Sequence, residues 1–157
     1  RKEMAERTLA IQNSFILLNL KKRRFKVKII IAGSRGITDY NMVERGMKKI
    51  REEHLKGVLP FGLTILSGCA RGVDTLAIRW AENHNANLCK YPANWDKFGK
   101  SAGFKRNQQM ANDADFLVTF WDGQSRGTRD MIARAKSQNI PTITFVVTGD
   151  CLIWQHE

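Results

Sequence analysis

Short apolar segments alternate along the chain with longer segments in which apolar and polar residues are mixed. The apolar segments lie at 27–32, 63–66, 87–91, 115–120 and 141–147. Their length and their content of Ile, Val, Leu and Phe are typical of strands that are buried on both faces. The segments that follow them predict helices, which end near residues 54, 85, 112 and 138. Asp39 or Asn41 can cap the first of these helices.

The repeated order of strand and helix predicts an α/β protein with a three-layer, Rossmann-like architecture. We expect an open, mostly parallel sheet of about five or six strands with helices on both faces. Residues 57–62 and 92–101 predict a turn and a loop between these elements. Ligands in such folds bind beyond the carboxyl ends of the strands, so the turns at that edge are the first places to look for function.

Two segments flank this repeat. Residues 2–20 predict an accessory helix, and the basic run 21–24 follows it. We therefore divide the chain into an accessory helix with a basic linker (1–24), an α/β domain (25–150) and a C-terminal tail (151–157), which could alternatively form a short sixth strand. The accessory helix either packs on the domain or on a partner chain, or it contacts nucleic acid or another acidic surface.

Charge is unevenly distributed along the sequence. The chain carries 26 Lys and Arg residues against 15 Asp and Glu residues, a formal net charge of +11. Residues 1–28 hold nine of the cations and two of the acids, so +7 of this charge belongs to the N-terminal segment. The rest of the chain is only mildly basic at +4, and this charge does not by itself require a nucleic-acid partner.

Cysteines and histidines are few and scattered, with three of each. Their positions do not match a ligand spacing or a disulfide framework, so we expect no metal site and no resident cofactor. Free thiols fit a reducing, cytoplasmic setting. No apolar run approaches the roughly 20 residues of a membrane-spanning helix, so we expect no membrane partner.

Three of the strand-to-helix turns share one chemical type. They are Gly33-Ser34-Arg35-Gly36, Ser67-Gly68-Cys69-Ala70-Arg71-Gly72-Val73-Asp74 and Asp122-Gly123-Gln124-Ser125-Arg126-Gly127-Thr128. Glycine lets the backbone approach a ligand, N–H groups at a helix start attract an anion, and arginine donates two hydrogen bonds to a phosphate. One such turn is often only a helix cap, but three at one sheet edge predict a phosphate-bearing ligand, most simply a nucleotide. None is a Walker loop or a G-x-G-x-x-G motif, which disfavours a kinase, a GTPase or a standard dehydrogenase.

Further candidate residues adjoin these turns. Asp74 begins the second predicted helix, where it either favours the helix dipole or hydrogen-bonds a ribose hydroxyl or orients a neighbouring arginine. Arg106 and Asn107 follow the loop that contains Trp95, and we expect them to close the site. Trp95 either stacks on a base or packs at the rim.

Taken in order, the motifs closely resemble those of the YspA-like family of the SLOG superfamily. The resemblance covers residues from about 27 to 147, which makes the 25–150 domain SLOG-like. Cys69 departs from the family pattern, in which we expect glycine. The motifs are Gly33-Ser34-Arg35, Ser67-Gly68-x-Ala70-Arg71-Gly72-x-Asp74, Pro92-Ala93-x-Trp95, Gly99-Lys100-x-Ala102-Gly103, Arg106-Asn107-x-x-Met110 and Phe120-Trp121-Asp122-Gly123-x-Ser125-Arg126-Gly127-Thr128.

The resemblance implies a protein that binds a nucleotide or a nucleotide-derived ligand such as ADP-ribose, as a sensor or a sequestering protein in stress or phage-conflict signalling. Dimers are common among similar proteins, so we expect a homodimer. The residues expected to bind the ligand are Gly33, Ser34, Arg35, Ser67, Gly68, Arg71, Gly72, Asp74, Trp95, Arg106, Asn107, Ser125, Arg126, Gly127 and Thr128.

Two more distant resemblances leave other functions open. LOG-type phosphoribohydrolases cleave an N-glycosidic bond and carry P-G-G-x-G-T-x-x-E; aligning their Gly-Thr with Gly127-Thr128 puts Met131 where the glutamate should be. A hydrolase would then have to use Asp74, Asp122 or Asp130 as its acid. The DNA-processing protein A family, which binds single-stranded DNA, shares the G-S-R, S-G-x-A-R-G-x-D and R-N motifs, so DNA is the alternative partner.

Overall fold

The computed structural model describes residues 1–22, 26–56, 58 and 62–156. The strands are β1 (Val27–Gly33), β2 (Leu63–Ser67), β3 (Asn87–Lys90), β4 (Phe116–Trp121), β5 (Thr142–Thr148) and β6 (Cys151–His156). The helices are α1 (Lys2–Lys22), α2 (Tyr40–His54), α3 (Val73–Asn83), α4 (Trp95–Phe98), α5 (Ala102–Asp113) and α6 (Arg126–Ser137), with the 3₁₀ turn η2 (Gly99–Ser101) between α4 and α5.

The six strands form one sheet in the order β3-β2-β1-β4-β5-β6. The first five are parallel to their neighbours, and β6 runs antiparallel to β5. This arrangement confirms the predicted α/β, Rossmann-like fold class. The strand order reverses between β1 and β4, and in open α/β sheets this reversal creates the crevice where ligands bind.

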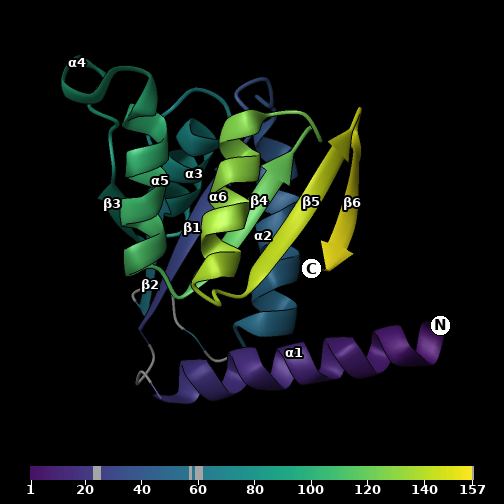
Figure 1. Cartoon of the computed structure of the whole chain (residues 1–157). Helices are drawn as coiled ribbons and strands as arrows, with labels where there is room; N and C mark the ends of the chain where they lie inside the picture. The colour runs from purple at the N-terminus through teal and green to yellow at the C-terminus, as the bar shows by residue number, and fades with distance from the viewer. Residues whose placement is uncertain (23–25, 57, 59–61, 157) are drawn as a thin grey trace.

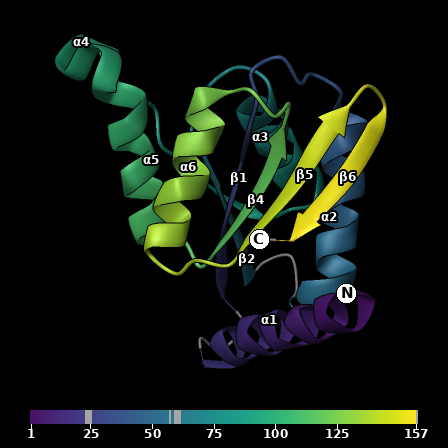
Figure 2. The same cartoon turned by 45° about the vertical axis from the view of Figure 1, so that its right-hand side comes forward.

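Helices cover the sheet on both faces (Figures 1 and 2). On β1, Ile29 and Ile31 belong to the core cluster that includes residues of α2 and α3. Ile30 and Ala32 belong to the second cluster, with residues of α5 and α6. Successive side chains of a strand point to opposite faces, so the part of a strand that lies between two helical layers is apolar on both faces. Burial of each Ile side chain contributes roughly 1.5–3 kcal/mol, which explains the run Ile29–Ala32, and Lys28 near the start of the strand is exposed.

Asp39, one of the two predicted caps, is the N-cap of helix α2. The Asp39 side chain accepts a hydrogen bond from the Asn41 N–H at 2.9 Å, and α2 begins at the residue after Asp39. Of the two candidate caps, Asp39 is therefore the one used. An N-cap of this kind contributes about 1 kcal/mol to the stability of the helix.

Three predicted segments have different outcomes. For the C-terminal segment, the alternative of a short sixth strand is observed instead of an unstructured tail, because residues 151–156 form β6. The sheet therefore extends past residue 150, the predicted end of the domain. The predicted loop at 92–101 instead contains α4 and η2, because the Asn94 side chain accepts from the Lys97 N–H at 3.0 Å and closes a helical turn. The turn predicted at 57–62 lies almost wholly outside the described residues.

The predicted accessory helix is observed as α1, which extends to Lys22 and includes part of the predicted linker. It runs along the end of the molecule opposite the carboxyl ends of β1 and β4 (Figures 1 and 2). No helix in the described ranges combines the length and the apolar character that crossing a bilayer requires.

Candidate functional site

The three glycine-containing turns meet at the carboxyl edge of the sheet. Ser34 joins them: its N–H donates to the Phe120 carbonyl at 3.0 Å, and its hydroxyl oxygen accepts from the Asp122 N–H at 3.0 Å. Gly72 has φ +75°, and a Cβ on it would lie 2.4 Å from the Ser34 carbonyl oxygen. Only glycine fits such a close approach. The turns after β1, β2 and β4 therefore form one continuous surface.

Two of the three serines predicted to contact the ligand, Ser34 and Ser67, shape these turns from the inside. Ser34 and Ser67 are essentially unexposed, at 1% and 0%. The Ser67 hydroxyl donates to the Asp74 carbonyl oxygen at 2.7 Å and accepts from the Cys69 N–H at 3.2 Å. Both hydroxyl groups are thus engaged within the protein, and these side chains position the backbone of the turns.

A cavity of about 110 Å³ opens where the turns meet. It lies at the end of β1, between the starts of α3 and α6, which is the reversal point of the strand order. Of its Ala and Met members, Ala70 and Met110 belong to the sequence motifs, whereas Ala32 carries no motif signal and is brought to the site by the topology. The lining consists of Ala32, Gly33, Arg35, Ala70, Asp74, Asn107, Met110, Ser125, Gly127, Thr128 and Met131.

The start of α6 forms one wall of the cavity. Ser125 is the N-cap, and its hydroxyl oxygen accepts from the N–H of Thr128 at 3.4 Å and from the Thr128 hydroxyl at 3.2 Å. Asp122 accepts from the N–H groups of Gln124 and Ser125 at 2.8 and 2.9 Å. Partial burial by itself would raise the pKa of Asp122, but these N–H groups outweigh it and hold the pKa below its ordinary value.

Two backbone donors remain available at this helix start. The first N–H groups of a helix have no partner inside the helix. Those of Arg126 and Gly127 make no hydrogen bond within the described part of the chain. The first turn of α6 contains no acidic residue, and Arg126 and Arg129 lie there instead. A cation in the first turn interacts unfavourably with the helix dipole and lowers the stability of the helix by about 0.3–1 kcal/mol. These arginines therefore do not stabilise α6, but they favour the binding of an anion at its start.

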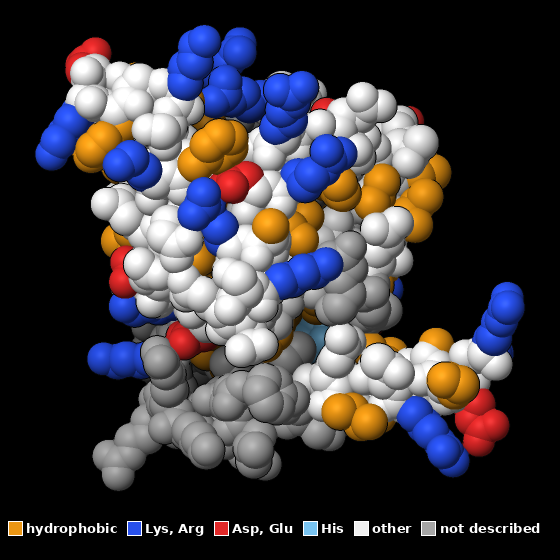
Figure 3. Space-filling model, in the orientation of Figure 1, with side chains coloured by type: hydrophobic (Ala, Val, Ile, Leu, Met, Phe, Trp, Pro, Cys, Tyr) orange, Lys and Arg blue, Asp and Glu red, His pale blue; other side chains and the backbone are white. Residues whose placement is uncertain are grey.

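Exposed arginines belong to the segments that form the cavity. Arg35, which lines it, and Arg71 come from the first two turns, and Arg126 and Arg129 come from the first turn of α6. Lys and Arg side chains gather along the upper edge of the molecule in Figure 3, which is the edge where the parallel strands end in Figure 1. Guanidinium groups in this position can donate two hydrogen bonds to a phosphate.

Asp74 is the acidic residue of the cavity. Its side chain is 5% exposed, and its Oδ2 atom accepts from the Ala70 N–H at 3.2 Å. Burial raises the pKa of Asp74 to about 6, against the opposing effects of the Arg106 guanidinium, the Ala70 N–H and the Arg35 guanidinium. The carboxyl group therefore titrates close to neutral pH.

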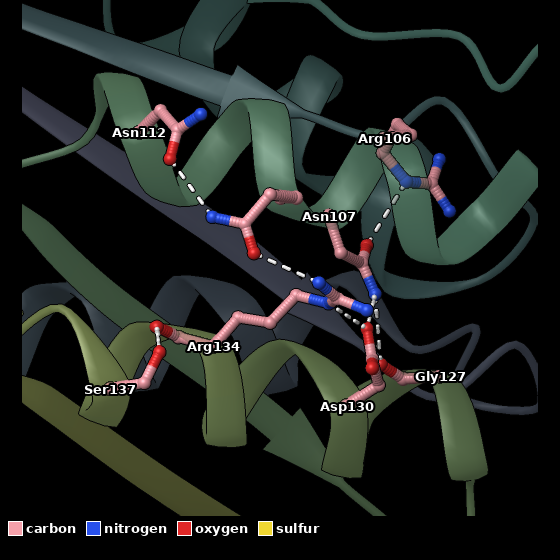
Figure 4. Close-up of polar contacts among 8 residues, drawn as sticks. Arg106, Asn107, Asn112, Gly127, Asp130, Arg134 and Ser137 are labelled. Carbon is pink, nitrogen blue, oxygen red and sulfur yellow. Dashed lines mark hydrogen bonds and ion pairs between the residues drawn. The ribbon is translucent and has the colours of Figure 1, made fainter.

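Arg106 and Asn107 connect the walls of the site (Figure 4). The Arg106 guanidinium donates to the Gly68 carbonyl oxygen through Nη1 and to Asn107 Oδ1 through Nε at 3.0 Å. The Asn107 amide donates to the Gly127 carbonyl oxygen at 3.2 Å and to Asp130 at 3.0 Å. Helix α5 thus holds the β2 turn and the start of α6 in fixed relation. Asn107 lines the cavity, and Arg106 supports the wall behind it.

The three acids that a hydrolase could have used occupy different environments. Asp130 pairs with Arg134 at 2.8 Å and accepts from Asn107. Asp122 is exposed and closes the turn before α6. Asp74 alone of the three lines the cavity, and Met131 lines it as well.

Two tryptophans border the site in different ways. Trp95 on α4 is 50% exposed, and its ring packs so close to Gly103 that a Cβ there would lie 3.4 Å from it. The Trp121 indole N–H donates to the Ser125 carbonyl oxygen at 3.2 Å, and the Arg129 guanidinium lies 5.7 Å from the ring centre. Trp95 therefore offers a free ring face at the rim, whereas Trp121 is part of the turn.

The unusual cysteine of the second turn adopts a conformation that favours glycine. Cys69 has φ +61°. For a residue with a Cβ, the left-handed region costs about 1–2 kcal/mol. Two hydrogen bonds hold the turn in this conformation: the Cys69 N–H donates to the Ser67 hydroxyl, and the Ala70 N–H donates to Asp74.

Comparison with known sequences points to one family. The profile of the YspA, cpYpsA-related SLOG family matches residues 27–98. The Gene 61 protein of Mycobacterium phage D29 is 36% identical over 124 residues, which cover 75% of this chain and 95% of that protein. The match therefore spans nearly the whole of that relative.

Comparison with solved structures gives a consistent fold. DNA processing protein A from Helicobacter pylori, whose structure concerns its single-stranded DNA binding mode, has a TM-score of 0.54 and 18% identity. That alignment covers 79% of this chain and 67% of the other. DNA processing protein A from Streptococcus pneumoniae has a TM-score of 0.61 and 17% identity, over 80% of this chain and 52% of the other, so this chain spans about half of its length. At these identities the likeness establishes the fold alone.

Proposed function

Because the chain belongs to the YspA, cpYpsA-related SLOG family, we propose that it binds a nucleotide or nucleotide-derived ligand whose phosphate lies at the start of α6. The observation that carries this proposal is the pair of N–H groups of Arg126 and Gly127, which have no partner among the described residues and belong to a helix start whose Ser125 and Gly127 line the cavity. A phosphate there accepts hydrogen bonds from both and lies at the positive end of the helix dipole.

The exposed arginines of the segments that form the cavity supply the remaining donors. Arg35 lines the cavity, and Arg71 and Arg126 extend from the neighbouring turns. A charge-assisted hydrogen bond to phosphate contributes roughly 1.5–3 kcal/mol. Arg106 is not one of these donors in our proposal, because its guanidinium is buried and engaged by Gly68 and Asn107.

The size of the cavity limits how the ligand binds. Sites for whole small molecules measure about 300–1,000 Å³, whereas this cavity measures about 110 Å³. In the proposed arrangement the phosphate and the sugar occupy the cavity and the base lies outside it. Trp95, an exposed ring on α4, is the candidate for stacking on the base. The protein binds and retains the intact ligand, as a sensor or a sequestering protein.

Isothermal titration calorimetry with ADP-ribose and adenosine 5′-monophosphate tests the proposal. Arg71→Ala should weaken binding about tenfold or more, because one phosphate contact is lost. Arg7→Ala removes the same charge from an exposed position on α1, at the opposite end of the molecule, and should leave affinity unchanged. Mass spectrometry of the mixture should return the ligand intact. Equal affinity for both variants, or no binding to either compound, would reject the site.

Single-stranded DNA is a second candidate ligand, favoured by one specific arrangement. The exposed Trp95 ring stands beside a basic edge, and Lys97 and Lys105 lie 5.0 and 4.4 Å from the ring centre of Phe98 on the same short helix as Trp95. Stacking rings among cations are typical of single-strand binding surfaces. The fold is also that of the DNA processing proteins named above.

Fluorescence anisotropy with a labelled oligonucleotide tests this candidate. If DNA is the ligand, affinity should fall steeply with salt, and Trp95→Ala should weaken binding by roughly 1–3 kcal/mol. Phe104→Ala is the matched control, because Phe104 is also an exposed aromatic residue but lies on α5. An affinity that is insensitive to salt would exclude a DNA-binding function.

A further inference from the structure

A buried carboxyl group shares the cavity with the proposed phosphate site. Asp74 lines the same space as Gly127 and Thr128. A carboxylate repels a phosphate, so a site selected only to bind an inorganic anion gains nothing from it. The carboxyl group therefore needs an explanation other than attraction for the phosphate.

One oxygen of Asp74 has a structural role and the other does not. Oδ2 accepts from the Ala70 N–H and so closes the β2 turn. Oδ1 makes no hydrogen bond to any described residue. Asp74 lines the cavity, and Oδ1 is not among the fully buried atoms without a partner in the described part of the chain, so this acceptor is open to a ligand. A ligand hydroxyl placed against it would form a charge-assisted hydrogen bond with the carboxylate.

The other polar groups of the cavity do not compete for this role. The Thr128 hydroxyl donates to Ser125, and the Asn107 amide donates to Gly127 and Asp130. The Met110 and Met131 side chains form apolar parts of the wall. Asp74 is thus the strong acceptor that the cavity presents to a ligand.

We infer that Asp74 makes the site selective for ribose, by accepting a hydrogen bond from a sugar hydroxyl while the phosphate lies at the start of α6. This inference rests on the proposed nucleotide-binding function and specifies the class of ligand. The cavity measures about 110 Å³, and the inference places the ribose and its phosphate in it and the base at its mouth. Ligands that lack the hydroxyl, such as a 2′-deoxynucleotide or inorganic phosphate, leave the carboxylate unpartnered and feel only its repulsion.

Calorimetry at pH 8 with adenosine 5′-monophosphate, its 2′-deoxy and 3′-deoxy analogues and inorganic phosphate tests the inference. At this pH the carboxyl group is ionised. We expect the ribonucleotide to bind at least about tenfold more tightly than one of the two deoxy analogues, and the weaker analogue identifies the hydroxyl that Asp74 binds.

Asp74→Asn is the decisive variant. It should reduce the preference for ribose to less than about threefold and should increase the affinity for inorganic phosphate, because the repulsive charge is removed. Asp150→Asn, which changes an exposed acid between β5 and β6 that does not line the cavity, should keep the full preference. The amide can still accept from the Ala70 N–H, so the variant should fold, and its circular dichroism spectrum should match that of the wild type.

The outcomes separate the two proposals. If the ribonucleotide and both deoxy analogues bind equally tightly, the role of Asp74 is overturned, and the nucleotide-binding function stands. If Asp74→Asn keeps the full preference for ribose, the inference is likewise overturned. If no nucleotide binds to the wild type, both proposals fail together.

Discussion

Replacing Asp74 by asparagine should make the protein more stable at neutral pH, although it removes a residue of the candidate site. The residue is only 5% exposed, and its carboxyl group has a pKa of about 6 in the folded protein, compared with an ordinary value of 3.8. At a pH between these two pKa values, the folded protein keeps the proton on the Asp74 carboxyl group, whereas the unfolded chain has released it. The free energy of unfolding therefore falls as the pH rises through this interval.

The magnitude follows from the two pKa values. Each pH unit between 3.8 and about 6 is worth about 1.4 kcal/mol, so the ionised carboxylate costs the folded protein about 3 kcal/mol at pH 8. The substituted asparagine side chain carries no charge at any of these pH values and keeps an oxygen for the Ala70 N–H. Asp74→Asn should therefore match the wild type near pH 4 and exceed its free energy of unfolding by up to about 3 kcal/mol above pH 6.

Urea unfolding at about pH 4.5, 5.5, 6.5 and 8, followed by circular dichroism, measures this difference. Asp122→Asn is the control of opposite sign, because the pKa of Asp122 is held below its ordinary value. Its carboxylate stabilises the folded protein above that value, and this contribution is lost as the pH falls through the lowered pKa. The Asp122 variant should therefore be less stable than the wild type at pH 8.

Two results would refute the reasoning on Asp74. One is a stability difference that does not change between the acidic and the alkaline end of this pH series. The other is an Asp74→Asn protein that is less stable than the wild type at pH 8, which would mean that the carboxylate has donors strong enough to offset its burial. Either result would also remove the argument that the carboxyl group awaits a donor from the ligand.

Three further substitutions probe the turns. Ser125→Ala removes the cap of α6 and should lower the free energy of unfolding in urea by about 1 kcal/mol. Gly33→Ala should destabilise the protein by about 3 kcal/mol or more, seen as a lowered melting temperature, because the new Cβ would lie 2.1 Å from the Phe120 carbonyl oxygen and separate β1 from β4. Cys69→Gly should raise the free energy of unfolding by up to about 1 kcal/mol, because relief of the strain at φ +61° exceeds the added freedom of the unfolded chain.

The sequence predicts the architecture well where the hydrophobic pattern of a segment matches its place in the fold. The apolar run at 27–32, interrupted by Lys28, indicates a strand covered on both faces, and β1 is that strand in the interior of the sheet. The family resemblance, deduced from motifs at the strand ends, is confirmed by the match over residues 27–98. Both inferences succeed because they use local signals that tertiary packing does not override.

Other features depend on contacts that no local pattern encodes. Residues 151–156 form a strand because β5 offers an antiparallel partner, from Ile143 to Thr148. Helix α4 forms because one Asn side chain closes a single turn within a segment that otherwise predicts a loop. The glycine-rich motifs indicate which turns matter, but not that the hydroxyls of Ser34 and Ser67 are engaged by the protein itself. Ala32 lines the cavity through topology alone, and Ala70 and Met110, although they belong to the motifs, are not among the residues expected to bind the ligand.

Ser34 has a consequence for how this domain can diverge. Its backbone and side chain hold the β4 strand, the turn before α6 and the start of α3, the last through the Val73 N–H at 3.4 Å. Lengthening any one of these connections would displace the other two. We therefore expect natural insertions and engineered fusions to be tolerated at the α1 end and at the β5–β6 hairpin, while the lengths of the three turns stay fixed.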